Sequence, residues 1–259
     1  MISIKKVDKV DYDNAPEYFE ILSNWYDAEI YNERIKNILG PLGKIEGKIL
    51  DVGTGIGTFS IELARRSHNN IVAFDFSSTA LKYAITNAES YKVSDKIHFV
   101  QGTVEALPFH SDYFDVIVAA DIIEHIYSSK LFLKEIHRVL KKAGKVVFET
   151  PNMDCFGVLG YPILKKTINK LFRLSDSRNI APIDPKYVEK YHVNNYTIKR
   201  LAREVEESGL KVTYIDTKGW WLELRGFDKI TNIIFEMPLF KNIFLRYKNT
   251  DIILVAEKR

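Results

Sequence analysis

The stretch ILDVGTGIGTFSIELARR, residues 49–66, decides the fold. The run Lys48 to Val52 predicts a buried strand, three glycines follow it, and a helix continues through Arg66. Glycine tolerates a positive φ and lets the backbone approach a ligand closely, and the N-terminus of a helix offers N–H groups to a polar or anionic ligand. The stretch therefore predicts a strand, a ligand-binding turn and a helix; the alternative is a tight turn that binds nothing.

The alternation of strands and helices continues outward from this stretch. Apolar runs predict further strands at 70–74, 97–101, 116–120, 145–150, 210–217 and 251–257, and helices at about 79–88, 130–140 and 197–208, the last of which stops at Gly209. Strands separated by single helices are typical of an α/β fold with a mostly parallel sheet and helices on both faces. We therefore expect one domain over 1–259, with a helical lid over 1–43 and a ligand-binding core over 44–150.

Two segments, 151–195 and 218–249, break the alternation. Each follows a predicted strand, the fifth and the sixth, so each leaves the sheet at the carboxyl end of a strand, where α/β sheets bind their ligands. We expect both segments to be inserts that cover the substrate. Within the first, 161–178 predicts a basic amphipathic helix that can contact an anionic membrane or hold an amphipathic substrate; the alternative is a lid helix with solvated lysines.

Composition excludes several classes of protein. The net charge of +3 over 259 residues gives no whole-protein case for nucleic-acid binding, for which a strongly basic face is expected. One cysteine, Cys155, rules out an intramolecular disulfide and a thiolate metal cluster. The first residues lack the apolar core of a secretory signal, and no apolar run approaches the ~20 residues that span a bilayer. We expect a cytoplasmic protein, with membrane contact only at its surface.

An acid at the end of the second predicted strand supports a nucleoside-containing ligand. Asp75 lies in IVAFDFS, about 20 residues past the glycines, where a carboxylate can accept both hydroxyls of a ribose. The alternative is an acid at the start of a helix, although Ser77 or Ser78 can cap that helix instead.

The glycine pattern resembles a known family. Gly-x-Gly-x-Gly with Asp51 two residues before the first glycine resembles the first motif of class I S-adenosylmethionine-dependent methyltransferases. The segment HFVQGTVEALPFHSDYFDVIVAADIIEHI, residues 98–126, resembles the mid-domain signature of the branch related to quinone biosynthesis, of the ubiquinone and menaquinone type. The resemblance covers about 48–152 and implies a Rossmann-like sheet of seven strands, with S-adenosylmethionine as cofactor and S-adenosylhomocysteine as product.

The resemblance also implies a set of cofactor contacts. Phe76 and Val104 would flank the adenine, although ordinary core packing explains them equally well. Thr103 stands where the family usually has an aspartate that contacts the adenine amino group. Arg34 would pair with the cofactor carboxylate, unless it is a surface arginine. The residues expected to bind the cofactor are Asp51, Gly53, Thr54, Gly55, Gly57, Asp75, Phe76, Gly102, Thr103, Val104, Ala119, Ala120 and Asp121.

Methyl transfer depends mostly on alignment of the acceptor with the methyl group, but a hydroxyl or amine acceptor also needs a base. The candidates are His125 and Asp121. An imidazole titrates near neutrality, which suits His125 to take a proton; the alternative for His125 is capping or packing. Asp121, Glu124 and His125 also resemble a metal-binding cluster of some quinone-type O-methyltransferases. We expect no metal here.

The acceptor is constrained more weakly. ADIIEH follows the fourth predicted strand, in place of the Asn/Asp-Pro-Pro-Tyr/Phe segment of enzymes that methylate nucleic-acid bases. The apolar inserts favour a small-molecule or lipid-like acceptor, and O-methylation over N- or C-methylation. The alternatives are a non-catalytic S-adenosylmethionine-binding module and a nicotinamide-dependent oxidoreductase, whose sites favour Gly-x-Gly-x-x-Gly.

Overall fold

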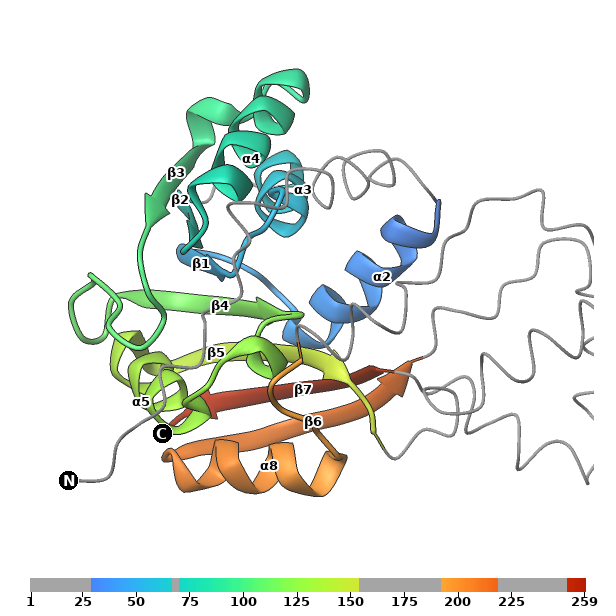
Figure 1. Cartoon of the computed structure of the whole chain (residues 1–259), viewed down its shortest axis with the longest axis vertical. Coiled ribbons are helices and arrows are strands. Elements are labelled where there is room, and N and C mark those ends of the chain that lie inside the picture. Colours follow the sequence, from blue (N-terminus) through green and yellow to red (C-terminus); the bar gives the residue numbers. More distant parts are fainter. Residues whose placement is uncertain (1–28, 67–69, 154–191, 219–250) are drawn as a thin grey trace, which may run out of the picture.

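The centre of the protein is a seven-stranded sheet in the order β3-β2-β1-β4-β5-β7-β6 (Figure 1). The structure is a computed structural model that describes residues 29–66, 70–153, 192–218 and 251–259. The first five strands are parallel, and β7 runs antiparallel to both of its neighbours, so the expected mostly parallel α/β sheet is confirmed. The strands are β1 (Lys48–Val52), β2 (Asn70–Asp75), β3 (Ile97–Gln101), β4 (Phe114–Ala120), β5 (Leu140–Pro151), β6 (Leu210–Lys218) and β7 (Asp251–Lys258).

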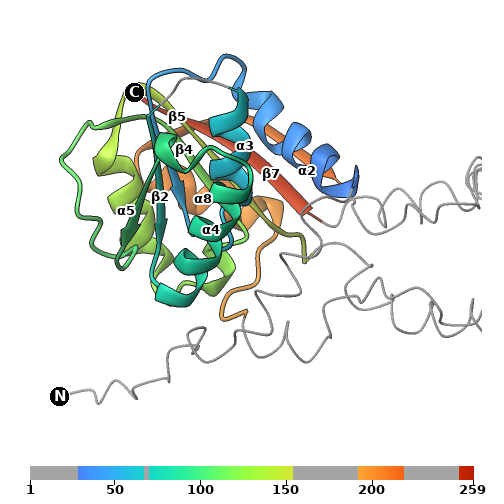
Figure 2. The same ribbon diagram turned by 90° about the horizontal axis from the view of Figure 1, so that it is seen from above.

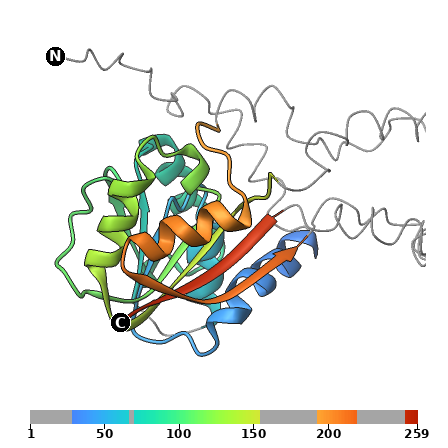
Figure 3. The ribbon, with the colours of Figure 1, turned by 90° about the horizontal axis from the view of Figure 1, so that it is seen from below.

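Helices cover both faces of the sheet, as the alternation predicts. One apolar cluster joins α2 (Glu29–Leu39), α3 (Thr58–Arg66) and α4 (Ser78–Ser90) to one face. The other joins α5 (Ser129–Val139) and α8 (Ile198–Glu207) to the opposite face. Views from opposite sides show these two layers (Figure 2 and Figure 3). Three short 3-10 helices, η2 (Gly40–Leu42), η3 (Ser94–Lys96) and η4 (Ile123–His125), complete the described elements.

The central strand shows why the sheet needs both layers. In β4, Ile117 and Ala119 pack into the cluster with α5 and α8, whereas Val116 and Val118 pack into the cluster with α2 and α3. All four are buried, because successive side chains of a strand point to opposite faces. An apolar strand without alternation is the sequence signature of this arrangement.

Helix ends follow local chemistry. The Ser77 hydroxyl accepts a hydrogen bond from the Ala80 N–H (3.1 Å) and caps α4. The Thr197 hydroxyl accepts one from the Arg200 N–H (3.2 Å) and caps α8. Gly209, with φ +93°, follows α8 where the sequence predicts its end. Several boundaries differ from expectation: β5, for example, begins at Leu140, and β6 continues to Lys218 within a predicted insert.

The helix α2 is part of the core, whereas the sequence predicts a lid over 1–43. Its residues Ile35, Ile38 and Leu39 are buried and pack with apolar residues of β1 and α3. The face of the sheet beside α3 would otherwise be exposed, and this explains why the helix lies there. Residues 1–28, and most of both predicted inserts with the stretch 161–178, lie outside the described residues. No helix in the described part of the chain is both long and apolar enough to span a membrane.

The core position of α2 predicts its contribution to stability. Replacement of Ile38, which is fully buried, by alanine should lower the free energy of unfolding by about 2–5 kcal/mol, because it removes apolar contacts and leaves a cavity. Lys36→Ala changes an exposed side chain of the same helix and should cost at most about 0.5 kcal/mol. Chemical denaturation of both variants measures the difference. Equal stability of the two variants would show that α2 does not belong to the core.

Candidate functional site

The glycine turn lies between β1 and α3 and is tied to the neighbouring strand. The N–H groups of Gly53 and Thr54 both donate to the Phe74 carbonyl oxygen of β2, at 2.8 and 3.0 Å. These two hydrogen bonds to one carbonyl oxygen place the glycines at the carboxyl end of the parallel strands. The side chain of Thr54 is buried, and its hydroxyl points into the turn, where it bonds Asp51 and Ser60.

The three glycines of the turn have different reasons to lack a side chain. All have positive φ: +75° at Gly53, +54° at Gly55 and +89° at Gly57. A Cβ atom at Gly53 would lie 2.4 Å from the side chain of Ile122, and one at Gly57 would lie 3.2 Å from Ala84. A Cβ atom at Gly55 would meet nothing within 4 Å. Gly55 therefore faces open space, and protein packing alone does not explain it.

Asp51 organises the turn from inside. Its Oδ2 accepts hydrogen bonds from the Thr54 hydroxyl (2.7 Å), the Ser60 N–H (3.0 Å) and the Ser60 hydroxyl (2.6 Å). Burial raises the pKa of Asp51 to about 6 although these hydrogen bonds oppose the shift. The described contacts of the Asp51 side chain hold the turn and the first turn of α3 together, so its expected part in cofactor binding is indirect.

Asp75 connects the end of β2 to the glycine turn. Its Oδ2 accepts the Gly55 N–H and its Oδ1 accepts the Ser77 N–H, both at 2.9 Å. The carboxylate is thereby fixed beside the open face of Gly55. Next to it, Phe76 is 38% exposed, and the Gln101 side-chain amide donates to its carbonyl oxygen (3.0 Å).

The loop after β3 lies on the other side of Asp75. The Gly102 N–H donates to the Asp75 carbonyl oxygen (3.0 Å), and a Cβ atom at Gly102 would lie 2.8 Å from the Phe74 ring. Val104 packs partly buried against the core. The exposed Thr103 donates its hydroxyl to the Glu105 carboxylate. Sequence reasoning passed over Glu105, although TVEAL places an acid two residues after the position where the family usually has one.

The end of β4 carries an ion network that reaches α2. Ala119 and Ala120 are buried in the sheet. Asp121 has φ +49°, and its N–H donates to the Glu149 carbonyl oxygen (3.0 Å). The Arg34 guanidinium pairs with two carboxylates, that of the half-exposed Asp121 and that of the buried Glu149. Its Nε and Nη2 donate to the two Glu149 carboxylate oxygens, at 3.2 and 2.7 Å. Arg34 is therefore an internal ion-pair partner and not an isolated surface arginine.

This network sets the charge of its two acids in opposite ways. Burial tends to raise the pKa of Asp121, but the Arg34 guanidinium outweighs it and lowers that pKa below its usual value. Burial raises the pKa of Glu149 well above its usual value even though Arg34 opposes the shift. Asp121 is therefore the ionised partner of Arg34.

The loop after β4 forms a second cluster with a segment far along the chain. The buried Glu124 accepts the Thr150 hydroxyl at Oε2 (2.8 Å). Its Oε1 lies 3.9 Å from Nε2 of His125, and the His125 ring meets the His192 ring edge to face at 4.8 Å. The sequence offered no signal for His192, which lies near the end of the predicted insert 151–195. Burial is the largest cause that raises the pKa of Glu124 to about 8, and the negative charge of Asp121 adds to it.

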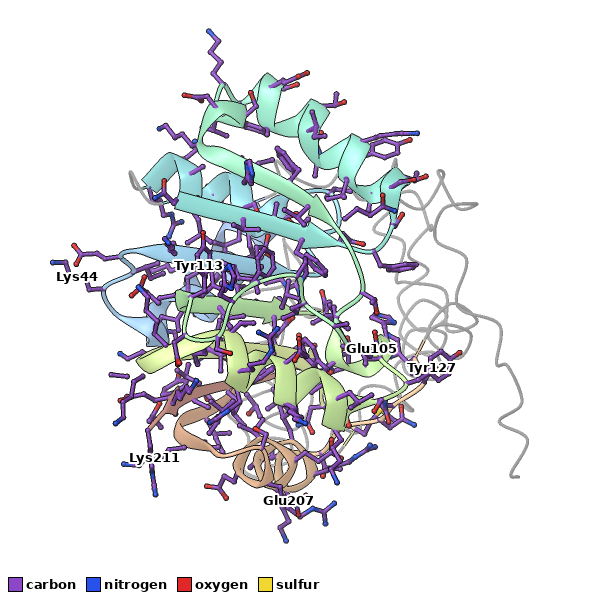
Figure 4. The ribbon with its side chains drawn as sticks, turned by 90° about the vertical axis from the view of Figure 1, so that its left-hand side faces the viewer. Lys44, Glu105, Tyr113, Tyr127, Glu207 and Lys211 are labelled. Carbon is purple, nitrogen blue, oxygen red and sulfur yellow. The ribbon has the colours of Figure 1, made fainter. Side chains whose placement is uncertain are left out.

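The structure therefore divides the predicted triplet of Asp121, Glu124 and His125. Asp121 bonds Arg34, whereas Glu124 and His125 lie with His192, with one nitrogen or oxygen of each within 4.8 Å of the others. Our expectation that no metal binds here stays a prediction. Glu105 and Tyr127 lie at the same edge of the molecule, away from Lys44 and Tyr113 (Figure 4). The described site combines an open glycine turn, a fixed carboxylate and a partly exposed imidazole.

The burial of Asp51 predicts a specific pH dependence. Its pKa is about 6 in the folded state and lower in the unfolded chain, so the folded state holds this proton more tightly. Its contribution to stability is complete below about pH 4 and is lost as the pH rises through about 6, a change of about 3 kcal/mol. The difference in unfolding free energy between wild type and Asp51→Asn, measured by denaturation across this range, should shift by that amount in favour of the variant. A pH-independent difference would contradict the assignment.

Comparison with solved structures agrees with the fold. A putative methyltransferase in complex with the Haloferax volcanii Trm112 methyltransferase activator is 16% identical, with a TM-score of 0.65 over 95% of this chain and 97% of that one. Phosphoethanolamine N-methyltransferase 2 of Haemonchus contortus, in complex with S-adenosyl-L-methionine, is 18% identical, with a TM-score of 0.64 over 97% of this chain and 58% of that one. At this identity the likeness shows the fold alone.

Comparison with curated proteins gives relatives in quinone biosynthesis. The ubiquinone/menaquinone biosynthesis C-methyltransferase UbiE of Geotalea daltonii is 34% identical over 115 residues, which are 42% of this chain and 49% of that protein. The demethylmenaquinone methyltransferase of Lactococcus lactis is 28% identical over 55% of this chain and 60% of its own length. The chain thus matches about half the length of these relatives.

A family model described as a methyltransferase domain matches residues 44–195, which is more than half of the chain. The match includes the glycine turn, Asp75, the loop after β3 and the end of β4, and the sheet order agrees with it. The chain therefore belongs to the methyltransferase domain family, whose class I members use S-adenosylmethionine as the methyl donor.

Proposed function

We propose that this chain binds S-adenosylmethionine at the carboxyl ends of β1, β2 and β4 and transfers its methyl group to a small-molecule or lipid-like acceptor, with oxygen as the favoured atom. The open face of Gly55 carries the proposal. Its positive φ already favours glycine, no atom of the described residues lies within 4 Å of its missing Cβ, and its N–H donates to the Asp75 carboxylate. A ligand that approaches the backbone at this point therefore has room beside a fixed carboxylate.

The residues around Gly55 fit the parts of the cofactor. The Asp75 carboxylate lies beside Gly55 at the end of β2, where a carboxylate can accept ribose hydroxyls. Phe76, which is partly exposed, and Val104 flank the adenine. Glu105, which the Thr103 hydroxyl contacts, supplies the carboxylate for the adenine amino group that Thr103 itself lacks. The bound cofactor supplies an electrophilic methyl group, and the protein contributes mainly alignment.

The methylated atom is a finer question. Transfer to a hydroxyl requires removal of its proton, and His125 is the nearest imidazole at the end of β4. Asp121 is less suited to this task, because its pairing with Arg34 lowers its pKa and makes its carboxylate a weaker base. The relatives named as C-methyltransferases favour carbon as the second candidate. Mass spectrometry of the product distinguishes an ether or ester from a new carbon–carbon bond.

Calorimetric titration with S-adenosylmethionine, S-adenosylhomocysteine and NAD tests the cofactor. We expect the first two to bind with micromolar affinity and NAD not to bind. Binding of NAD alone would return the chain to the oxidoreductases. Transfer of a labelled methyl group to phenolic, quinol and lipid acceptors then tests catalysis, and cofactor binding without transfer to any acceptor class favours a non-catalytic binding module.

Substitution of two glycines tests the turn. Gly55→Ala places a methyl group in the space where we propose the cofactor lies, and it should weaken S-adenosylmethionine binding about tenfold or more. Gly43→Ala is the matched control, because Gly43 also has a positive φ (+73°) and open space at its Cβ position. Both variants place alanine at a positive φ, and only Gly55→Ala adds a group at the proposed cofactor site, so calorimetry of the two separates strain from ligand contact. Equal affinity in both folded variants would remove Gly55 from the cofactor site.

A further inference from the structure

The loop after β4 contains a buried carboxyl group that the cofactor site does not use. Glu124 is 2% exposed and lies in η4. Its backbone carbonyl oxygen accepts the N–H groups of Val193 and Asn194, both at 2.9 Å, and the Asn194 side chain donates to the Ile126 carbonyl oxygen (2.5 Å). The loop after β4 is therefore fastened to the segment that precedes α8, and the Glu124 side chain has a fixed origin.

One oxygen of this carboxyl group is satisfied and the other is not. Oε2 accepts the Thr150 hydroxyl at 2.8 Å. Oε1 is buried and has no hydrogen-bond partner among the described residues. A buried oxygen without a partner is costly, and such atoms in folded proteins call for an explanation. The polar group that faces it is Nε2 of His125, at 3.9 Å. A movement of about 1 Å would bring this nitrogen into hydrogen-bond distance.

The His125 ring is restrained from its other side by His192. The two rings meet edge to face, with centroids 4.8 Å apart. Burial lowers the pKa of His192 to about 4, so this ring is neutral at physiological pH and restrains His125 without competing for its proton. Among the described residues, the other charged groups around the pair are Asp121 with Arg34 of α2, and Asp251 of β7.

We propose that Glu124 and His192 position His125 as the base that removes a proton from a hydroxyl acceptor. The inference rests on the proposed methyl transfer and assigns its substrate class. Nε2 of His125 donates to Glu124, so the other ring nitrogen takes the acceptor proton. The acceptor oxygen bonds to the methyl carbon, the carbon–sulfur bond breaks, and its electron pair goes to sulfur. The imidazolium that results is balanced by the Glu124 carboxylate. Enzymes commonly orient a base through a third group, and such contacts are often long before the substrate binds.

Histidine NMR of the full chain tests the pair without a known acceptor. In wild type labelled with nitrogen-15 at histidine, the His125 ring signals should shift in a second step near pH 8, when Glu124 ionises. Glu124→Gln should abolish that step. Glu135→Gln is the matched control, because Glu135 pairs with Arg138 on α5 and lies outside this cluster. Absence of the step in wild type, or its persistence in Glu124→Gln, would overturn the pairing.

Two further variants distinguish the proposed pairing from misfolding of Glu124→Gln and from a purely structural role of Glu124. Thr150→Val removes the hydroxyl that stabilises the Glu124 carboxylate, and it should move the step to higher pH, while an unmoved step contradicts the assignment. His192→Asn should broaden the His125 signals, because the ring loses its restraint.

The pH profile of turnover, on an acceptor identified by the labelled-methyl assay, tests the same pair in catalysis. The rate should rise through about pH 8 in wild type. In Glu124→Gln the rise through about pH 8 should be absent, with a plateau at least about tenfold lower. Identical profiles, or a carbon-methylated product, would overturn the role while leaving cofactor binding intact.

Discussion

The carbonyl and carboxylate groups at the end of β2 are the constraint on which the site depends. The Phe74 carbonyl oxygen accepts two N–H groups of the glycine turn, and the Asp75 carboxylate accepts a third, from Gly55. These bonds hold the turn against a neighbouring strand, while Asp51 holds it from within. The turn can expose Gly55 to a ligand only because its other polar groups already have partners. The shape of the cofactor-binding turn therefore depends on the pairing of β1 with β2.

The acceptor side of the same edge obeys a different constraint, which is the burial of acids. Glu124 and Glu149 are both almost fully buried, and burial raises both pKa values. Arg34 compensates part of this cost by pairing with Glu149 and Asp121. A low dielectric makes each remaining contact matter more. Buried carboxyl groups of this kind lower the stability of the fold. Their raised pKa values are consistent with a role in proton transfer, because strongly shifted pKa values cluster at functional sites.

The part of the site that residues close together in the sequence build, which is the glycine turn with Asp75, could be predicted from the sequence. The strand, the three glycines and the helix follow from 49–66, and the spacing of Asp75 from the turn follows from one strand–helix–strand unit. The contacts Arg34–Asp121 and Glu124–Val193 join residues far apart in the sequence, so no periodicity signals them. His192 was missed for this reason, whereas Glu105 had a local signal, because it lies two residues after Thr103. The lid over 1–43 stays a prediction; its described part, α2, packs into the core, because an apolar helical face does not say which surface it will cover.

This division has a consequence for how the site can vary. The cofactor half is defined by backbone hydrogen bonds between β1 and β2, so most substitutions elsewhere leave it intact. The acceptor half depends on Arg34 from α2 and on His192 from a segment that precedes α8. Both reach the end of β4 from outside the strand-and-turn unit. A change at His192 is therefore expected to alter the proposed acceptor site without disturbing the sheet, as for functional groups added to a stable fold, whereas a change at Arg34 also removes the ion pair of the buried Glu149.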